Sequence, residues 1–204
     1  MDRRRFCLTS AAAAISGAAV SVAGLAAARP SDPMPPGATR SSIRLYKFIY
    51  DRRYPSGRAF GAAAEYTGST AGIVGIGGDV TELWSRDLRP RWSAGGGAIA
   101  GMTTARTLFC LEQLARDHWM RVVIRAEHSV SPGQDAVHRL TAAEPMMVGM
   151  RSALAAADWP ARMPAALVAA CGGAKGASTT RVIGSARGLD WATRDEQLVS
   201  FVIA

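Results

Sequence analysis

Short apolar runs alternate with segments of helical periodicity along this chain, and the alternation predicts its fold. Runs rich in β-branched, aromatic or small apolar residues predict strands at residues 43–50, 71–76, 98–101 and 121–125. Helices are expected between them: residues 56–66, a segment from Asp79 that should end near Pro90, and a segment capped by Thr103 or Thr104 that runs to His118. Strands and helices in this order favour parallel strands joined by right-handed crossovers.

The second half of the chain carries a weaker pattern. Helices are expected at residues 144–157 and 163–170, and late strands at residues 181–184 and 198–203. The short, nearly all-apolar strands of the first half suit a sheet that is covered on both faces. We therefore expect a three-layer αβα domain over residues 43–204, with a mostly parallel sheet. The C-terminal strand is expected at an edge, where it could run antiparallel.

Length and composition agree with one globular domain. The chain has 204 residues, of which 49% are hydrophobic and 20% charged, and this excludes a disordered, collagen-like or disulfide-dense protein. The formal net charge is +8, but the arginines are scattered and form no long basic run. Nucleic-acid binding is therefore not expected.

The N-terminus has the three parts of an export signal. Arg3, Arg4 and Arg5 precede Phe6, and an uncharged run rich in Ala, Gly, Ser and Val extends to Ala28. The arrangement resembles a twin-arginine (Tat) signal, with Arg3, Arg4 and Phe6 on the motif positions of that family. Asp2 stands where the family usually has Ser or Thr. A general secretory signal and an uncleaved membrane anchor are the alternatives, although the Ala, Gly and Ser content makes a poor anchor.

The resemblance implies recognition by the Tat translocase and cleavage near Ala28. The mature protein would then be periplasmic, without a stable membrane span. Loss of three Arg and one Asp would lower its formal charge from +8 to +6. Residues 29–42 contain four Pro and read as an extended linker to the domain.

Two cysteines would remain after cleavage, Cys110 and Cys171. A disulfide is possible in an oxidising compartment, but Tat cargo folds before export in a reducing one. We expect two separate thiols, with Cys110 buried in the apolar segment around Leu111.

Candidate chemistry gathers where the predicted strands end. In open α/β sheets, ligands bind beyond the carboxyl ends of the strands, and Asp51, Asp79 and His128 stand at three of these ends. Two carboxylates there could divide acid and base roles or hold a divalent cation, with His128 as a general base. The simpler reading is structural: Asp79 caps its helix and Asp51 pairs with an Arg.

Three arginines surround the start of the first predicted helix. A helix N-terminus offers free N–H groups, and arginine adds a bidentate fork, so Arg52, Arg53 and Arg58 could bind a carboxylate or phosphate. Solvated loop arginines are the commoner alternative.

No motif implies a cofactor. The glycines at positions 75, 77 and 78 do not complete a dinucleotide-binding fingerprint, and no P-loop or nucleophile elbow is present. The three His lie ten residues apart, which is no metal-binding spacing. Met146, Met147 and Met150 could bind Cu(I), but packing in the core explains them more simply.

Two classes of function fit these observations. The first is an exported ligand-binding or accessory protein, such as the partner of a periplasmic redox enzyme. The second is a small exported enzyme, hydrolytic or metal-dependent, that uses the Asp, His and Arg residues at the strand ends.

Overall fold

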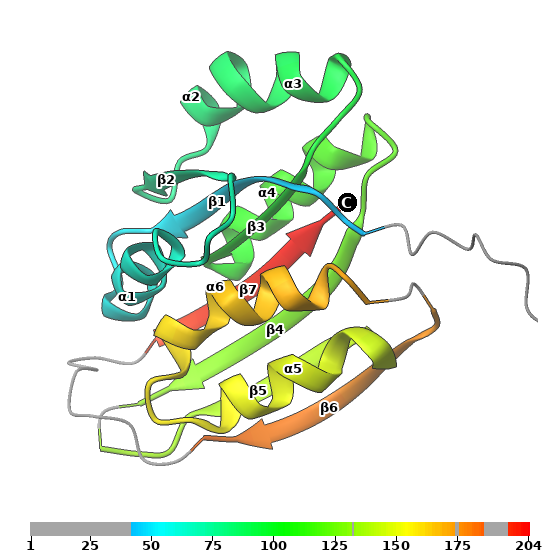
Figure 1. The fold of residues 1–204 in the computed structure, drawn as a ribbon. Coiled ribbons are helices and arrows are strands. Elements are labelled where there is room, and N and C mark those ends of the chain that lie inside the picture. Colours follow the sequence, from blue (N-terminus) through cyan, green and yellow to red (C-terminus); the bar gives the residue numbers. More distant parts are fainter. Residues whose placement is uncertain (1–41, 132, 174–175, 186–195) are drawn as a thin grey trace, which may run out of the picture. The chain divides into compact units, whose positions relative to one another are not determined.

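The computed structural model describes residues 42–131, 133–173, 176–185 and 196–204, which form one α/β domain (Figure 1). The predicted export segment and all but the last residue of the linker lie outside the described residues. The strands are β1 (Leu45–Asp51), β2 (Gly72–Ile76), β3 (Ala98–Thr103), β4 (Val122–Val130), β5 (Val137–Ala143), β6 (Ser178–Gly184) and β7 (Glu196–Ile203). The helices are α1 (Pro55–Ala64), α2 (Thr81–Leu83), α3 (Arg89–Ser93), α4 (Ala105–Arg116), α5 (Glu144–Ala155) and α6 (Trp159–Ala170).

All seven strands belong to one mixed sheet with the order β2-β1-β3-β7-β4-β5-β6. Strand β1 pairs in parallel with β2 and β3, and the remaining four pairings are antiparallel. Because β7 is antiparallel to both β3 and β4, the strands β1 to β4 all run in one direction. Their carboxyl ends therefore lie at one edge of the sheet, as the sequence predicts.

The position of β7 corrects a prediction. The C-terminal strand is antiparallel, but it lies at the centre of the sheet and not at an edge. All but one of its eight residues are buried, and five of the eight are apolar, as expected for a strand that is covered on both faces. Strand β5 was not predicted, because His138 and Arg139 interrupt the apolar pattern on which the prediction rests.

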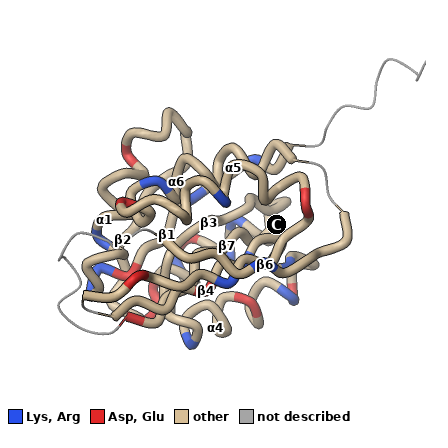
Figure 2. The backbone as a smooth tube through the Cα atoms, turned by 90° about the horizontal axis from the view of Figure 1, so that it is seen from below, with Lys and Arg blue, Asp and Glu red and all other residues tan. Residues whose placement is uncertain are grey.

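Helices cover the sheet in two layers, which confirms the αβα class (Figure 2). Helices α1, α5 and α6 lie on one face, and α4 lies on the other together with α2 and α3. Among the described residues, none of the helices combines the length and hydropathy that a membrane span needs.

The prediction that the second helix ends near Pro90 is wrong. A π-helical segment, Trp84–Leu88, joins α2 to α3 without a break, and Pro90 lies in the first turn of α3. A proline inside a continuous helix lacks the N–H that would bond to the preceding turn, but the π-helical segment directly before Pro90 already departs from α-helical hydrogen bonding. Thr104 caps α4 as predicted, since its Oγ1 accepts a hydrogen bond from the backbone N–H of Thr107 at 3.3 Å.

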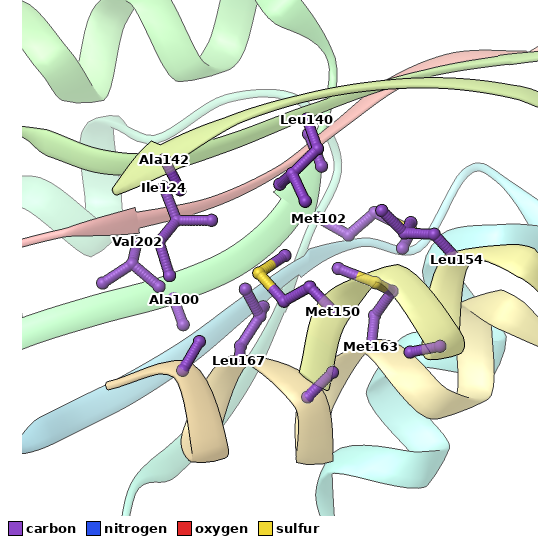
Figure 3. Packing of buried hydrophobic residues seen from close by; sticks show 14 of the residues in the cluster. Ala100, Met102, Ile124, Leu140, Ala142, Met150, Leu154, Met163, Leu167 and Val202 are labelled. Atoms are coloured by element: carbon purple, nitrogen blue, oxygen red, sulfur yellow. The ribbon is translucent and has the colours of Figure 1, made fainter. Parts of the chain in front are cut away.

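The larger core lies between the sheet and helices α5 and α6. Met102, Met150 and Met163 pack there with Leu140, Leu154 and Leu167 (Figure 3). Met146, Met147 and Met150 are at most 2% exposed and belong to this core. Their burial among apolar side chains agrees with the packing role and leaves no open face for copper.

The cysteines remain two free thiols, as expected, but the burial of Cys110 was predicted wrongly. Cys110 lies on the exposed side of α4, whereas Leu111 and Leu108 are fully buried on its other side. Cys171 is buried, and burial raises the pKa of its thiol to about 11. It is therefore an unreactive thiol at neutral pH.

Candidate functional site

The carboxyl edge of β1, β2 and β3 holds most of the predicted site residues. Asp51 is the last residue of β1, and its backbone pairs with Ile76 at the end of β2. Asp79 follows β2 after the glycine pair at positions 77 and 78. The two aspartates thus lie at the ends of neighbouring strands, on the same edge of the sheet. Asp51 is fully buried, whereas Asp79 is exposed.

Asp51 is fully buried and bound by one arginine. Its Oδ1 accepts hydrogen bonds from the backbone N–H of Arg53 at 3.1 Å and from Nε of Arg53 at 2.9 Å. Its Oδ2 accepts a bond from Nη2 of the same residue at 2.6 Å. This bidentate pair satisfies both carboxylate oxygens, so Asp51 plays the structural role that was its simpler reading.

The guanidinium of Arg53 also reaches the loop after β2. A Cβ atom on Gly78 would lie 2.3 Å from Nη2 of Arg53, and Gly78 has φ +92°. A side chain there would both collide with the guanidinium and strain the backbone. Oγ1 of Thr107 donates to the Gly78 carbonyl at 3.1 Å, which ties the loop to the first turn of α4. These contacts connect the end of β1, the loop after β2 and the start of α4.

Asp79 lies in the open part of this edge. Its Oδ1 accepts hydrogen bonds from the Thr81 backbone N–H at 2.8 Å and from the Thr81 hydroxyl at 2.7 Å. These bonds lower the pKa of Asp79, so its carboxyl group is ionised at neutral pH. The prediction that Asp79 is the N-cap is wrong, because Val80 occupies the N-cap position of α2 and Asp79 precedes it.

A groove of about 560 Å³ runs beside β2, and we call it the β2 groove. Arg52, Gly75, Gly77, Asp79, Glu82 and Arg86 are among the residues that line it. Nη2 of Arg52 would lie 3.7 Å from a Cβ on Gly77, so the guanidinium extends over this glycine. Because Gly77 carries no side chain, the space beside the Arg52 guanidinium stays open, whereas a Cβ on Gly75 would instead meet the ring of Tyr50 at 2.8 Å.

Some of the charged side chains that line the β2 groove form ion pairs, and others do not. Glu82 pairs with Arg86 at 2.6 Å, and Asp87 pairs with Lys47 at 2.5 Å and accepts a bond from the Tyr46 hydroxyl. Within the part of the chain that the structure describes, neither Arg52 nor Asp79 has an ion-pair partner. One free positive and one free negative charge therefore face the same groove.

The side chains of Arg53 and Arg58 bind residues of the loop between β1 and α1 and its flanks, and neither lines the β2 groove. Arg53 holds Asp51, and its guanidinium lies 5.5 Å from the ring of Tyr54. Nη1 of Arg58 donates to the backbone carbonyl of Arg52 at 3.0 Å. Of the three arginines predicted to bind an anion, Arg52 lines the β2 groove.

His128 lies elsewhere. It is 1% exposed on β4, three strand positions from β1, which corresponds to about 14 Å. Its Nδ1 is 2.9 Å from Nδ1 of His138, and its Nε2 is 2.8 Å from Oγ of Ser200. The structure therefore brings Asp51 and Asp79 to one edge but does not bring His128 to them.

The two histidines form a buried cluster with Trp159, whose indole ring lies 4.3 Å from the ring of His128 and 4.7 Å from that of His138. Burial and the neighbouring His138 lower the pKa of His128 well below its usual value, and burial lowers the pKa of His138 to about 4. Both rings are neutral at pH 7, so one Nδ1 donates to the other. A buried neutral imidazole of this kind stabilises the core and is poorly placed for proton exchange with a ligand.

A second buried polar pair was missed by sequence reasoning. The hydroxyl of Ser56, in the first turn of α1, donates to Oε2 of Glu196 at the start of β7, and both residues are fully buried. Oε1 of Glu196 has no hydrogen-bond partner among the described residues. The pair joins residues 140 positions apart, and no local pattern could have revealed it.

Two general searches gave negative results. Within the described ranges, His, Cys, Asp and Glu side chains form no group of three that could hold a metal ion. Comparison of the chain with protein-family models, curated proteins and solved structures finds no match.

Proposed function

We propose that this protein is an exported ligand-binding protein that takes a small zwitterion, such as a free amino acid, in the β2 groove. The observation that carries the proposal is the pair of unpaired opposite charges, Arg52 and Asp79, on one open groove. The guanidinium of Arg52 suits a carboxylate, because its fork can donate two parallel hydrogen bonds. The carboxylate of Asp79 suits an ammonium group.

The surroundings of the groove support this use. Glu82 and Asp87 are neutralised by Arg86 and Lys47, so their charges do not compete for Arg52. Thr81 keeps Asp79 ionised and holds its carboxylate in one orientation, which lowers the entropic cost of binding. The volume of about 560 Å³ lies within the range of small-molecule sites.

Binding is tested by calorimetric titration of the purified protein with a panel of free amino acids. At least one of them should bind, and Arg52→Gln and Asp79→Asn should each weaken that binding by about 10- to 100-fold, because each removes one charge-assisted contact. Asp79→Asn keeps an oxygen that can accept from Thr81, so the melting temperature should change little.

Arg89→Gln is the matched control, since Arg89 is exposed on α3 and does not line the groove. The control should bind as the unchanged protein does. If no amino acid binds, or if Arg52→Gln and Asp79→Asn bind as tightly as the control, the proposed function is wrong.

Export is the second part of the proposal. The resemblance of Arg3, Arg4 and Phe6 to a Tat motif supports a periplasmic site of action after cleavage near Ala28. A periplasmic protein with an open groove could sequester a solute or present it to a partner. The accessory role beside a redox enzyme stays a prediction.

A further inference from the structure

Trp119 projects from the turn that follows α4, and its side chain is 97% exposed. It is the only described residue other than glycine with a positive φ, at +59°. The turn is closed by hydrogen bonds from the Trp119 N–H to the Arg116 carbonyl at 3.0 Å and from the Met120 N–H to the Ala115 carbonyl at 3.1 Å. Glycine is the usual residue at such a position, so tryptophan there is both strained and solvated.

A hollow of about 510 Å³ lies beside this projecting indole. The chain neighbours of Trp119, His118 and Met120, both line it, and Trp92 forms a further wall. The imidazole of His118 lies 5.9 Å from the ring of Trp92, within the range of favourable aromatic contacts. Trp92 itself is only 4% exposed and donates its Nε1–H to the Gly97 carbonyl at 2.9 Å, so the half-buried His118 is the more accessible of the two rings.

The floor of the hollow is kept free of side chains by three successive glycines. Gly95, Gly96 and Gly97 have φ values of +115°, +88° and +153°, which other residues rarely adopt. A Cβ atom on Gly95 or Gly96 would meet no atom within 4 Å, so the space beside these two residues is open. A projecting indole and an open hollow are thus adjacent in the sequence, because the residues on either side of Trp119 line the hollow.

We infer that this surface is a homodimer interface, in which each Trp119 occupies the hollow of a second copy of the chain. In a dimer with a twofold axis, the same surface of each copy contacts the other copy. Because Trp119 and the hollow lie on one surface, each indole can then enter the hollow of the partner. Buried tryptophans at the centre of an interface contribute a large share of binding energy.

Charge complementarity supports the same occupant. Asp117 is exposed beside Trp119, and Arg44 is exposed on the wall of the hollow. Neither has an ion-pair partner within the described part of the chain. In the dimer, Asp117 of one copy faces Arg44 of the other, so the projection and the hollow carry opposite charges.

Sedimentation velocity over a wide range of protein concentrations tests the inference. The unchanged protein should dimerise, and Trp119→Ser should weaken dimerisation by about 30-fold or more, as loss of a central tryptophan does. Tyr66→Ser is the matched control, because Tyr66 is 86% exposed but follows α1 on the other layer of the molecule. A monomer at every concentration, or a dimer that Trp119→Ser leaves intact, would overturn the inference.

Two further variants separate association from folding. Trp119→Gly should abolish the dimer as Trp119→Ser does, yet its monomer should melt at a higher temperature, since glycine relieves the strained φ. Asp117→Arg and Arg44→Asp should each weaken the dimer, and the double variant should restore it. A double variant that associates no better than either single one would overturn the arrangement of the two copies.

Discussion

Acidification should destabilise this protein through the buried histidine pair. The folded state keeps His138 neutral with a pKa of about 4, whereas in the unfolded chain its pKa is about 6.5. The unfolded state therefore binds more protons between these values, and the free energy of unfolding falls as the pH is lowered through this range. Above about pH 6.5 the stabilisation from the neutral ring is fully present.

The expected loss is a sizeable fraction of the stability of an ordinary domain. Between pH 7 and pH 5, the shift of His138 alone removes about 2 kcal/mol from the free energy of unfolding. His128 acts in the same direction, because burial and the neighbouring His138 lower its pKa as well. Domains of this size are stable by only about 5–15 kcal/mol.

Chemical denaturation at pH 7, 6 and 5 measures the effect. Replacing His138 with Gln keeps a side chain that can accept from His128 but removes one titrating ring, so the pH dependence should shrink. His118→Gln is the control, since His118 is only half-buried, at the end of α4. Equal stabilities at pH 7 and pH 5, or an equal pH dependence in the two variants, would refute the reasoning.

Three other predictions concern stability and export. Leu111→Ala should cost about 2–5 kcal/mol in chemical denaturation because Leu111 is fully buried, whereas Phe109→Ala, 59% exposed on the same helix, should cost less than about 1 kcal/mol. Asp51→Asn should cost about 1–2 kcal/mol, because it weakens the pair between this buried carboxylate and the half-exposed guanidinium of Arg53; an unchanged melting temperature would contradict that role. Replacing Arg3 and Arg4 with Lys should leave precursor in the cytoplasm, as fractionation and immunoblotting can show.

The first half of the fold could be predicted because its signals are local. The strands at residues 71–76 and 98–101 are continuous apolar runs, and Thr104 marks the start of α4 with its own hydroxyl. Each signal needs only neighbouring residues. The alternation of strand and helix then fixed the common direction of β1 to β4 and hence the edge where Asp51 and Asp79 lie.

The later elements depend on contacts between distant residues. Strand β5 carries His138 in the core, which becomes acceptable only because His128 of β4 lies opposite it as a hydrogen-bond partner. Because His128 is buried against His138, it is not available at the predicted site with Asp51 and Asp79. Glu196 is likewise buried only because α1 supplies Ser56. Sequence periodicity cannot show such partners, since they meet only after the chain has folded.

The central position of β7 has a consequence for the order in which the protein can form. Strand β7 fills the gap between β3 and β4 but follows every other strand in sequence order, so β2-β1-β3 and β4-β5-β6 are separate sheets until β7 pairs with both. Until then, the unpaired edges of β3 and β4 are open to strands of other chains. Joining the two halves of the sheet is therefore the last step in its assembly, and deletion of β7 would leave both halves with an unpaired edge.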